Sequence, residues 1–188
     1  IEDRFYKDLE FGTGGLRGVI GAGSNRMNIY TVKKVTQGLS EYLLKEYKNR
    51  DVSVSIAYDS RIMSKEFAKE ASLTLCANGI RVNLFESLRP TPMLSYTVRH
   101  LKSNAGIVIT ASHNPKEYNG YKVYGEDGGQ VTDKKAKDII TCVNNIKDLK
   151  QVKSFILEEA KEKKLLNIIG EELDRDYIND VKKLTIRN

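Results

Sequence analysis

The stretch AGIVITASHNP, residues 105–115, decides the expected fold. It begins with a run of apolar residues that lacks the alternation of a half-exposed strand, which indicates a strand buried on both faces. Strands of that kind belong to sheets that lie between two layers of helices. The polar residues that follow stand at the carboxyl end of the strand, where open α/β sheets bind their ligands. This stretch therefore predicts both a sandwich and the edge at which its function lies.

Helix and strand patterns alternate in the part of the chain before this strand. We expect, in order, a helix over residues 29–47, a strand over 52–58, a helix over 64–78, a strand over 80–85 and a helix over 91–101. Asn28 and Ser64 stand at the starts of two of these helices as N-caps. Each parallel connection between strands needs a helix to return the chain. The expected fold class is therefore α/β, a three-layer α/β/α sandwich.

The residues after the buried strand bring antiparallel pairing and then a change of pattern. Residues 121–131 have the pattern of a hairpin around a glycine-rich turn, so the sheet should be mixed and mostly parallel. A helix over residues 133–146 should close a first domain, which we place at residues 1–148. We expect residues 149–188 to be a connector and the start of a second, missing domain. The charge-rich helical segments expected there are residues 157–166 and 171–184.

The composition is that of a folded, soluble domain. Of the 188 residues, 40% are hydrophobic, 30% are charged and three are proline, so a disordered chain is excluded. No apolar run approaches the roughly 20 residues of a membrane span, so we expect no membrane partner and a cytoplasmic location. Cys76 and Cys142 have neither CxxC spacing nor a histidine partner, so we interpret them as reduced, buried thiols.

The net charge of +6 does not by itself indicate a nucleic-acid partner. Most Lys and Arg residues alternate with Glu and Asp along helical segments, as in residues 158–164, and such a face is usually solvated. Interleaved aromatic residues, a recognition motif and a single basic face are all lacking. We therefore expect no nucleic acid, and a smaller basic set near glycine-rich loops favours a compact anion such as a sugar phosphate.

Three polar groups are delivered to the sheet edge by the loop after residue 109. They are the hydroxyl of Ser112, the imidazole of His113 and the amide of Asn114. Pro115 should stiffen this loop, and the following residues 119–120, Asn-Gly, should allow a sharp return of the chain. The loop is the first candidate for a functional site.

Two other interpretations of this loop remain open on the residues alone. Ser112 and Asn114 are of types that often only satisfy loop amides. A serine hydrolase is a further possibility, but His113 follows Ser112 directly, whereas a catalytic triad needs its base aimed at the hydroxyl from elsewhere. The G-x-S-x-G elbow of such enzymes is also absent.

Three motifs, in order along the chain, resemble those of the α-D-phosphohexomutase family. TASHNP at residues 110–115, followed by YNGYKVY at 118–124, is similar to the family's phosphoserine loop. FGTGGLRG at residues 11–18 resembles its N-terminal motif, and Asp59-x-Arg61 stands in the place of its D-x-R element. The resemblance covers residues 10–146 and is closest to the branch of bacterial phosphoglucomutases and animal phosphopentomutases.

The resemblance implies an intramolecular phosphotransferase. Ser112 would carry a phosphoryl group, give it to the substrate, and recover a phosphoryl from a bisphosphorylated sugar. The expected substrates are glucose 1-phosphate and glucose 6-phosphate, with glucose 1,6-bisphosphate as activator. Phosphomannomutase and phosphopentomutase are the alternatives within the family. A non-catalytic module that binds a phosphosugar or a protein partner is the alternative from another class.

The resemblance also assigns roles to particular residues. Lys122 would act as general acid/base or neutralise the transferring phosphoryl, and His113 would assist proton transfer or only position the loop. Arg17 would bind phosphate, because the glycines around it let backbone amides approach an anion closely. The remaining phosphate contacts expected are Thr13, Gly14, Arg61 and Asn114, with Arg61 also able, beside Asp59, to support the loop instead.

The family's Mg²⁺ loop, D-x-D-x-D, is absent from this sequence. The resemblance therefore leaves one metal ligand here, a phosphate oxygen on Ser112, and places the others in a missing domain. The family's sugar-recognition loop and its substrate-phosphate loop are missing too. The expected partners are a sugar phosphate and the remaining domains of the same polypeptide, and the chain alone is expected to be inactive.

Overall fold

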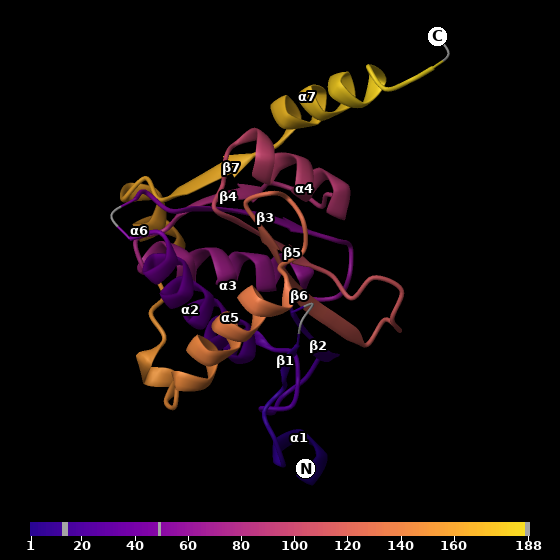
Figure 1. Ribbon diagram of the computed structural model, residues 1–188. Coiled ribbons are helices and arrows are strands. Elements are labelled where there is room, and N and C mark those ends of the chain that lie inside the picture. The colour runs from indigo at the N-terminus through magenta and orange to yellow at the C-terminus, as the bar shows by residue number, and fades with distance from the viewer. Residues whose placement is uncertain (13–14, 49, 187–188) are drawn as a thin grey trace.

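The computed structural model describes residues 1–12, 15–48 and 50–186, which form one sheet between two layers of helices (Figure 1). The strands are β1 (Phe11–Gly12), β2 (Gly15–Val19), β3 (Ser53–Tyr58), β4 (Arg81–Phe85), β5 (Ala105–Ile109), β6 (Tyr118–Gly125) and β7 (Leu166–Ile169). The helices are α1 (Glu2–Phe5), α2 (Ile29–Glu46), α3 (Ser64–Ala77), α4 (Thr91–His100), α5 (Asp133–Asn145), α6 (Leu157–Glu162) and α7 (Glu171–Lys182), with a 3₁₀ turn at Leu149–Gln151.

The sheet has the strand order β1-β2-β6-β5-β3-β4-β7 and two halves. β5, β3, β4 and β7 are parallel neighbours, and of these β3, β4 and β5 are joined through α3 and α4 as predicted. β5, β6, β2 and β1 are antiparallel neighbours. Of the hairpin predicted over residues 121–131, the first arm lies in β6, and the second is reduced to a single bridge between Gln130 and Tyr124. The expectation of a mixed sheet in an α/β fold is confirmed. Among the strands described, three neighbouring pairs are parallel and three are antiparallel, so the sheet is not mostly parallel as expected.

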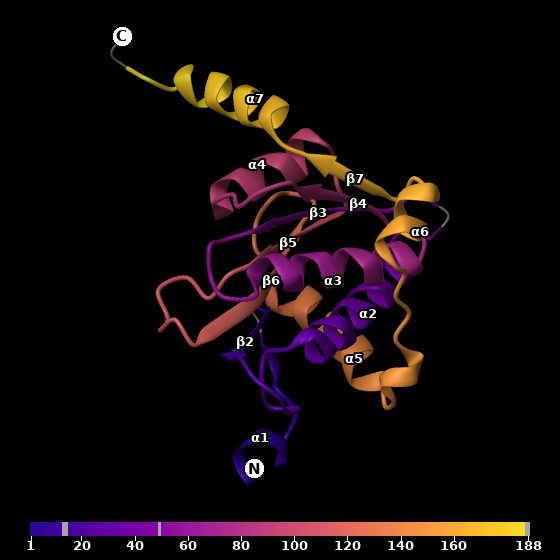
Figure 2. The same ribbon diagram turned by 180° about the vertical axis from the view of Figure 1, so that it is seen from behind.

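The two faces of the sheet are covered by different helices. α2, α3, α5 and α6 lie on one face, and α4 and α7 lie on the other, as the two opposite views show (Figures 1 and 2). Side chains alternate between these layers: Ile107 of β5 packs in the α2/α3 core, and its neighbour Val108 packs under α4. Both are at most 1% exposed, so this strand is buried on both faces, as its apolar run predicted.

The start of α2 shows how local sequence places an element. The Asn28 side chain accepts hydrogen bonds from the backbone N–H groups of Tyr30 and Thr31, and the Thr31 hydroxyl accepts from the Asn28 N–H in return. This capping box satisfies amides that have no partner within the helix. The N-cap predicted at Asn28 is therefore confirmed.

Two local predictions near the sheet edge were wrong. Ser64 is the first residue of α3 rather than its N-cap, which is Met63, and the Ser64 hydroxyl donates to Asp59 Oδ1 at 2.7 Å instead. A hydrogen bond to an ionised carboxylate is stronger than one between neutral groups. The hydroxyl therefore donates to Asp59 instead of accepting from a helix amide. Residues 119–120 lie within β6 and make no sharp return, because pairing with β2 and β5 extends them.

The helix predicted over residues 157–166 was also wrong in its second half. α6 ends at Glu162, and residues 166–169 form β7, which pairs in parallel with β4. Hydrogen bonding to a strand more than 80 residues earlier overrides the local helical pattern, as tertiary context often does. β7 thus extends the sheet, and the division of the chain at residue 148 stays a prediction.

Candidate active site

Ser112 lies in a tight turn directly after β5. The turn is closed by a hydrogen bond from the Asn114 N–H to the Ala111 carbonyl, 3.1 Å long. Ser112 occupies its first central position with φ of 55°, a conformation that favours glycine, and its N–H donates to Thr110 Oγ1 at 2.9 Å. The side chain is exposed at the carboxyl edge of the parallel strands. The predicted nucleophile is therefore presented to solvent by a strained backbone.

Lys122 reaches Ser112 from the neighbouring strand. Its ammonium group donates to Ser112 Oγ at 2.7 Å. The register of β5 and β6 pairs Val108 with Lys122, so the ladder itself brings the lysine beside the loop that follows β5. Lys122 is half-buried, which limits the directions in which its side chain can extend. The structure thus brings together two of the three predicted catalytic residues.

Arg17 lies on the same face of the sheet as Lys122. β2 pairs with β6 so that Arg17 stands opposite Gly120, two residues before Lys122. Diagonal neighbours of this kind have side chains that start about 7–8 Å apart. A Cβ on Gly120 would meet the Thr110 carbonyl at 2.6 Å, so only glycine lets the three strands meet here. Arg17 is exposed, and its cation therefore faces the solvent beside the serine loop.

Arg61 lies beneath the loop and binds its backbone. One terminal nitrogen, Nη2, donates to the carbonyls of Ser112 and Asn114 at 2.6 and 2.7 Å. The other, Nη1, donates to the carbonyls of Pro115 and Tyr118 at 3.0 and 3.1 Å. Of the two roles predicted for Arg61, this geometry favours support of the loop over contact with phosphate.

Asp59 holds Arg61 from the end of β3. Its Oδ2 lies 3.4 Å from Arg61 Nε, and its Oδ1 accepts from the Arg61 backbone N–H at 3.0 Å and from Ser64. The buried amide of Asn119 donates to Ser64 Oγ at 3.0 Å and to the Ile62 carbonyl at 2.9 Å. A continuous polar network therefore runs from β6 through α3 to the serine loop.

Sequence reasoning missed Thr110, Ser64 and Asn119 as members of this site. Thr110 accepts from the Ser112 N–H, Ser64 donates to the carboxylate of Asp59 that holds Arg61, and Asn119 donates to Ser64. A signal existed for Asn119, since a polar residue within a mostly apolar strand usually has a buried partner. The partners of Asn119 and Ser64 lie on other elements and have no local signal.

The other predicted residues differ in how the structure places them. His113 is exposed and its side chain makes no hydrogen bond with the residues that the structure describes. The Asn114 side-chain amide donates to the Ala111 carbonyl at 2.9 Å and so stiffens the turn. Thr13 and Gly14 lie outside the described residues. Their phosphate contacts, like that of Asn114, stay predictions.

The described residues do not by themselves form a magnesium site. No group of three or more His, Cys, Asp or Glu side chains within residues 1–12, 15–48 and 50–186 is placed to hold a metal ion. Mg²⁺ prefers an octahedron of oxygen ligands, and Asp59, a carboxylate within the loop network, already binds Arg61 and Ser64. Ser112 alone leaves such a site incomplete.

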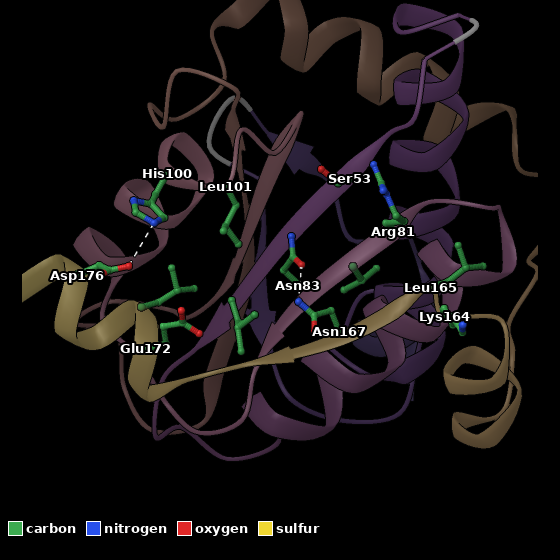
Figure 3. A pocket seen from close by; sticks show the side chains of 13 residues that line it. Ser53, Arg81, Asn83, His100, Leu101, Lys164, Leu165, Asn167, Glu172 and Asp176 are labelled. Carbon is green, nitrogen blue, oxygen red and sulfur yellow. Dashed lines mark hydrogen bonds and ion pairs between the residues drawn. The ribbon is translucent and has the colours of Figure 1, made fainter.

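A groove of about 510 Å³ lies on the α4-side face, over the starts of β3, β4 and β7 (Figure 3). Asn167 donates to Asn83 Oδ1 at 3.2 Å on its floor, and His100 Nε2 lies 3.4 Å from an Asp176 carboxylate oxygen at one end. Parallel strands start at the opposite edge from the one where Ser112 stands. This groove is therefore separate from the reactive groups, and we place the candidate active site at the serine loop.

Two further observations bear on the class of protein. No helix in the described part of the chain is long and apolar enough to cross a membrane. Residues 8–150 match the family described as "Phosphoglucomutase/phosphomannomutase, alpha/beta/alpha domain I". The chain therefore belongs to the phosphoglucomutase/phosphomannomutase family, the α-D-phosphohexomutases, as the motifs predicted.

The names of individual relatives include three different activities. A phosphoglucomutase of Staphylococcus saprophyticus is 39% identical over 176 residues, covering 94% of this chain and 32% of the relative. A phosphopentomutase of Homo sapiens is 39% identical over 187 residues, covering 95% and 30%. A crystal structure of a phosphomannomutase candidate from Thermus thermophilus superposes with a TM-score of 0.77 at 28% identity, covering 94% and 36%. The chain thus spans about a third of the length of these relatives.

Proposed function

We propose that this chain is the phosphoserine domain of an enzyme that moves a phosphoryl group between two hydroxyls of a sugar phosphate. The contact between Lys122 Nζ and Ser112 Oγ, 2.7 Å at the open edge of the sheet, carries the proposal. Glucose 1-phosphate and glucose 6-phosphate are the proposed pair, since phosphoglucomutases are among the relatives. Phosphomannose and phosphopentose remain the alternatives, because relatives of those names share the same domain.

The proposed reaction is two phosphoryl transfers. A substrate hydroxyl oxygen bonds to the phosphorus on Ser112 while the bond from phosphorus to Oγ breaks, and Lys122 protonates the departing Oγ. The proton of the attacking hydroxyl passes to His113, which is exposed beside the serine. The bisphosphorylated sugar then returns its other phosphoryl to Ser112 by the reverse steps. The phosphoserine is regenerated and the sugar is isomerised.

Charge explains why the site needs its cations. A phosphoserine carries about −1.5 to −2 charges at neutral pH. Lys122 and Arg17 lie on the same open face and together offset that charge. Without these cations, the phosphoserine would repel an anionic substrate. Lys122 stabilises the negative charge that develops on Ser112 Oγ, and the exposed Arg17 binds the phosphate of the incoming substrate.

The other components of the enzyme are proposed to come from outside this chain. Mg²⁺ would be held by a phosphate oxygen on Ser112 and by ligands from further domains of the same polypeptide, and would offset charge there. Glucose 1,6-bisphosphate is the proposed activator that restores the phosphoserine. The enzyme is proposed to be cytoplasmic, without membrane or nucleic-acid partners. The chain by itself is proposed to be inactive and to bind Mg²⁺ weakly, because a single oxygen does not make an octahedral site.

Removal of the nucleophile tests the proposal in the complete polypeptide. Intact mass should show one phosphoryl group on the parental protein, absent from Ser112→Ala and retained by the control Ser154→Ala, which alters an exposed serine. Conversion of glucose 1-phosphate should be lost only in Ser112→Ala. Near-parental turnover by Ser112→Ala with glucose 1,6-bisphosphate supplied would refute the phosphoserine. Sugar-phosphate binding without phosphoserine or turnover would instead indicate a binding module.

A further inference from the structure

Ser112 holds a backbone conformation that its own residue type disfavours. Its φ of 55° falls at the first central position of the turn, where a side chain is strained and glycine is preferred. A strained residue persists only when its surroundings determine it more strongly than its own preference. The neighbours of Ser112 within the turn, Thr110 Oγ1 and the Ala111 carbonyl, restrain amides only. Something else must hold the carbonyl side of the loop.

The guanidinium of Arg61 is that restraint. Its two terminal nitrogens each donate to two loop carbonyls, and its Nε faces the Asp59 carboxylate at 3.4 Å. Four of the five N–H groups of the fork thus donate to backbone carbonyls, and the fifth lies beside a carboxylate. This arrangement leaves Arg61 poorly placed to bind a phosphate. Its charge and its planar shape are used to gather carbonyl oxygens on one side of the loop.

By binding the Ser112 carbonyl, Arg61 also orients the backbone amide of His113. In a trans peptide the N–H points opposite to the C=O, so the N–H of His113 points away from Arg61 when Arg61 binds the Ser112 carbonyl. The His113 N–H has no hydrogen-bond partner within the described part of the chain. An unpartnered amide next to the serine is a suitable donor for an oxygen of a phosphoryl group on Ser112.

From this geometry we propose that Arg61 is a positioning residue for phosphoryl transfer. It keeps Ser112 in its left-handed conformation, Oγ beside Lys122, and it aims the His113 N–H at the phosphoryl group. Asp59 orients Arg61 for this task. The inference rests on the proposed function, since the group that is positioned is the phosphoserine.

The first experiment tests the clamp without any substrate. Hydrogen exchange of the 188-residue chain would be followed by NMR in the parental protein, in Arg61→Lys and in Arg175→Lys, a matched change at an exposed arginine of α7. Lysine keeps the charge but loses the fork, so the amides of Asn114 and Tyr118 should exchange at least about tenfold faster in Arg61→Lys. The control should leave them unchanged. Unchanged exchange in Arg61→Lys would overturn the clamp.

The second experiment tests positioning in the complete polypeptide. Arg61→Lys should lower kcat at least about tenfold with KM changed less than about twofold, because the loss falls on the transfer and not on ground-state binding. Added guanidinium ion should restore part of the kcat of Arg61→Ala and leave Arg61→Lys unaffected. A rise in KM at constant kcat would show that Arg61 binds substrate phosphate and would overturn the positioning role.

The two experiments separate this inference from the proposed function. A loosened loop with normal kcat would overturn positioning and reduce Arg61 to a structural residue. If the parental polypeptide showed no phosphoserine and no turnover, the proposed function would be refuted. The proposal that Arg61 positions a phosphoryl group would then be refuted too. In that event the exchange data alone would decide whether Arg61 clamps the loop.

Discussion

The two halves of the sheet differ in whether helices cover their α4-side face. On the α4-side face, the antiparallel half leaves Arg17 and Lys122 accessible beside the serine loop. The parallel half covers the same face with α4 and α7, under which Phe85 and Val108 are at most 1% exposed. Reactive groups therefore gather where no helix covers the face, and stability comes from where helices do. Substitutions in the two halves should affect different measurements.

The largest effect is expected from Lys122. Lys122→Met keeps the length of the side chain but removes the proton donor to Ser112 Oγ, so turnover of the complete polypeptide should fall by about 10²–10⁴-fold. The melting temperature should change little, since a half-buried methionine can fill the same space. Lys137→Met, at an exposed position of α5, is the control. Turnover equal to the control would exclude Lys122 from the transfer.

Arg17 should separate activity from stability most clearly. Arg17→Ala removes an exposed cation that makes no hydrogen bond within the described residues. The loss of a charged contact to phosphate should reduce kcat/KM by roughly 10–10²-fold, equal to about 1.5–3 kcal/mol. Melting of the 188-residue chain should stay unchanged. A large drop in melting temperature without impaired turnover would instead give Arg17 a structural role.

Arg89 should show the opposite behaviour in the parallel half. Its guanidinium forms a two-bond ion pair with Asp174 of α7, at 2.7 and 2.6 Å, and this pair raises the pKa of Arg89. Arg89→Met should lower the free energy of unfolding by about 1–2 kcal/mol, because Asp174 is left partly buried without its partner. Turnover should remain within about twofold of the parental value.

Urea unfolding measures this change, with Arg175→Met on the solvent side of α7 as the control. Equal stability of the two variants would show that the Arg89 pair contributes nothing to the docking of α7. Loss of turnover in Arg89→Met would break the proposed separation between the two halves of the sheet.

The smallest effect concerns pH and the buried thiol of Cys76 in α3. Burial raises the pKa of Cys76 from its ordinary 9.0 to about 12. The folded state therefore keeps a proton that the unfolded state loses, so this stability is fully present below pH 9 and is lost as the pH rises toward 12. Between pH 7.5 and pH 10 the loss should be about 1.4 kcal/mol.

Urea unfolding at these two pH values checks the prediction, and Cys76→Ala should reduce the difference by that amount. The Cys142 thiol, which is only half-buried, supplies the comparison: its pKa is also raised, chiefly by burial. An identical pH dependence in Cys76→Ala would show that other groups, such as the buried tyrosines, account for the alkaline loss.

Local patterns in the sequence were sufficient for the framework. The apolar run at residues 105–109 predicted a strand buried on both faces, and Asn28 predicted the start of α2. Both are decided by neighbours a few residues away, through side-chain alternation and a capping box. The serine loop could be identified for the same reason, because its reactive residue types follow the strand directly and its motif is contiguous.

Tertiary structure alone showed which groups the residues of the candidate site contact. Arg61 and Ser112 are 51 residues apart, and the sequence left Arg61 between phosphate contact and loop support until its four carbonyl partners were visible. β7 likewise exists because β4 offers it backbone partners, although its flanks have a helical composition. Such contacts depend on which elements the sheet order brings together. A local pattern specifies an element's own hydrogen bonds and exposed faces, but not the distant groups that those faces meet.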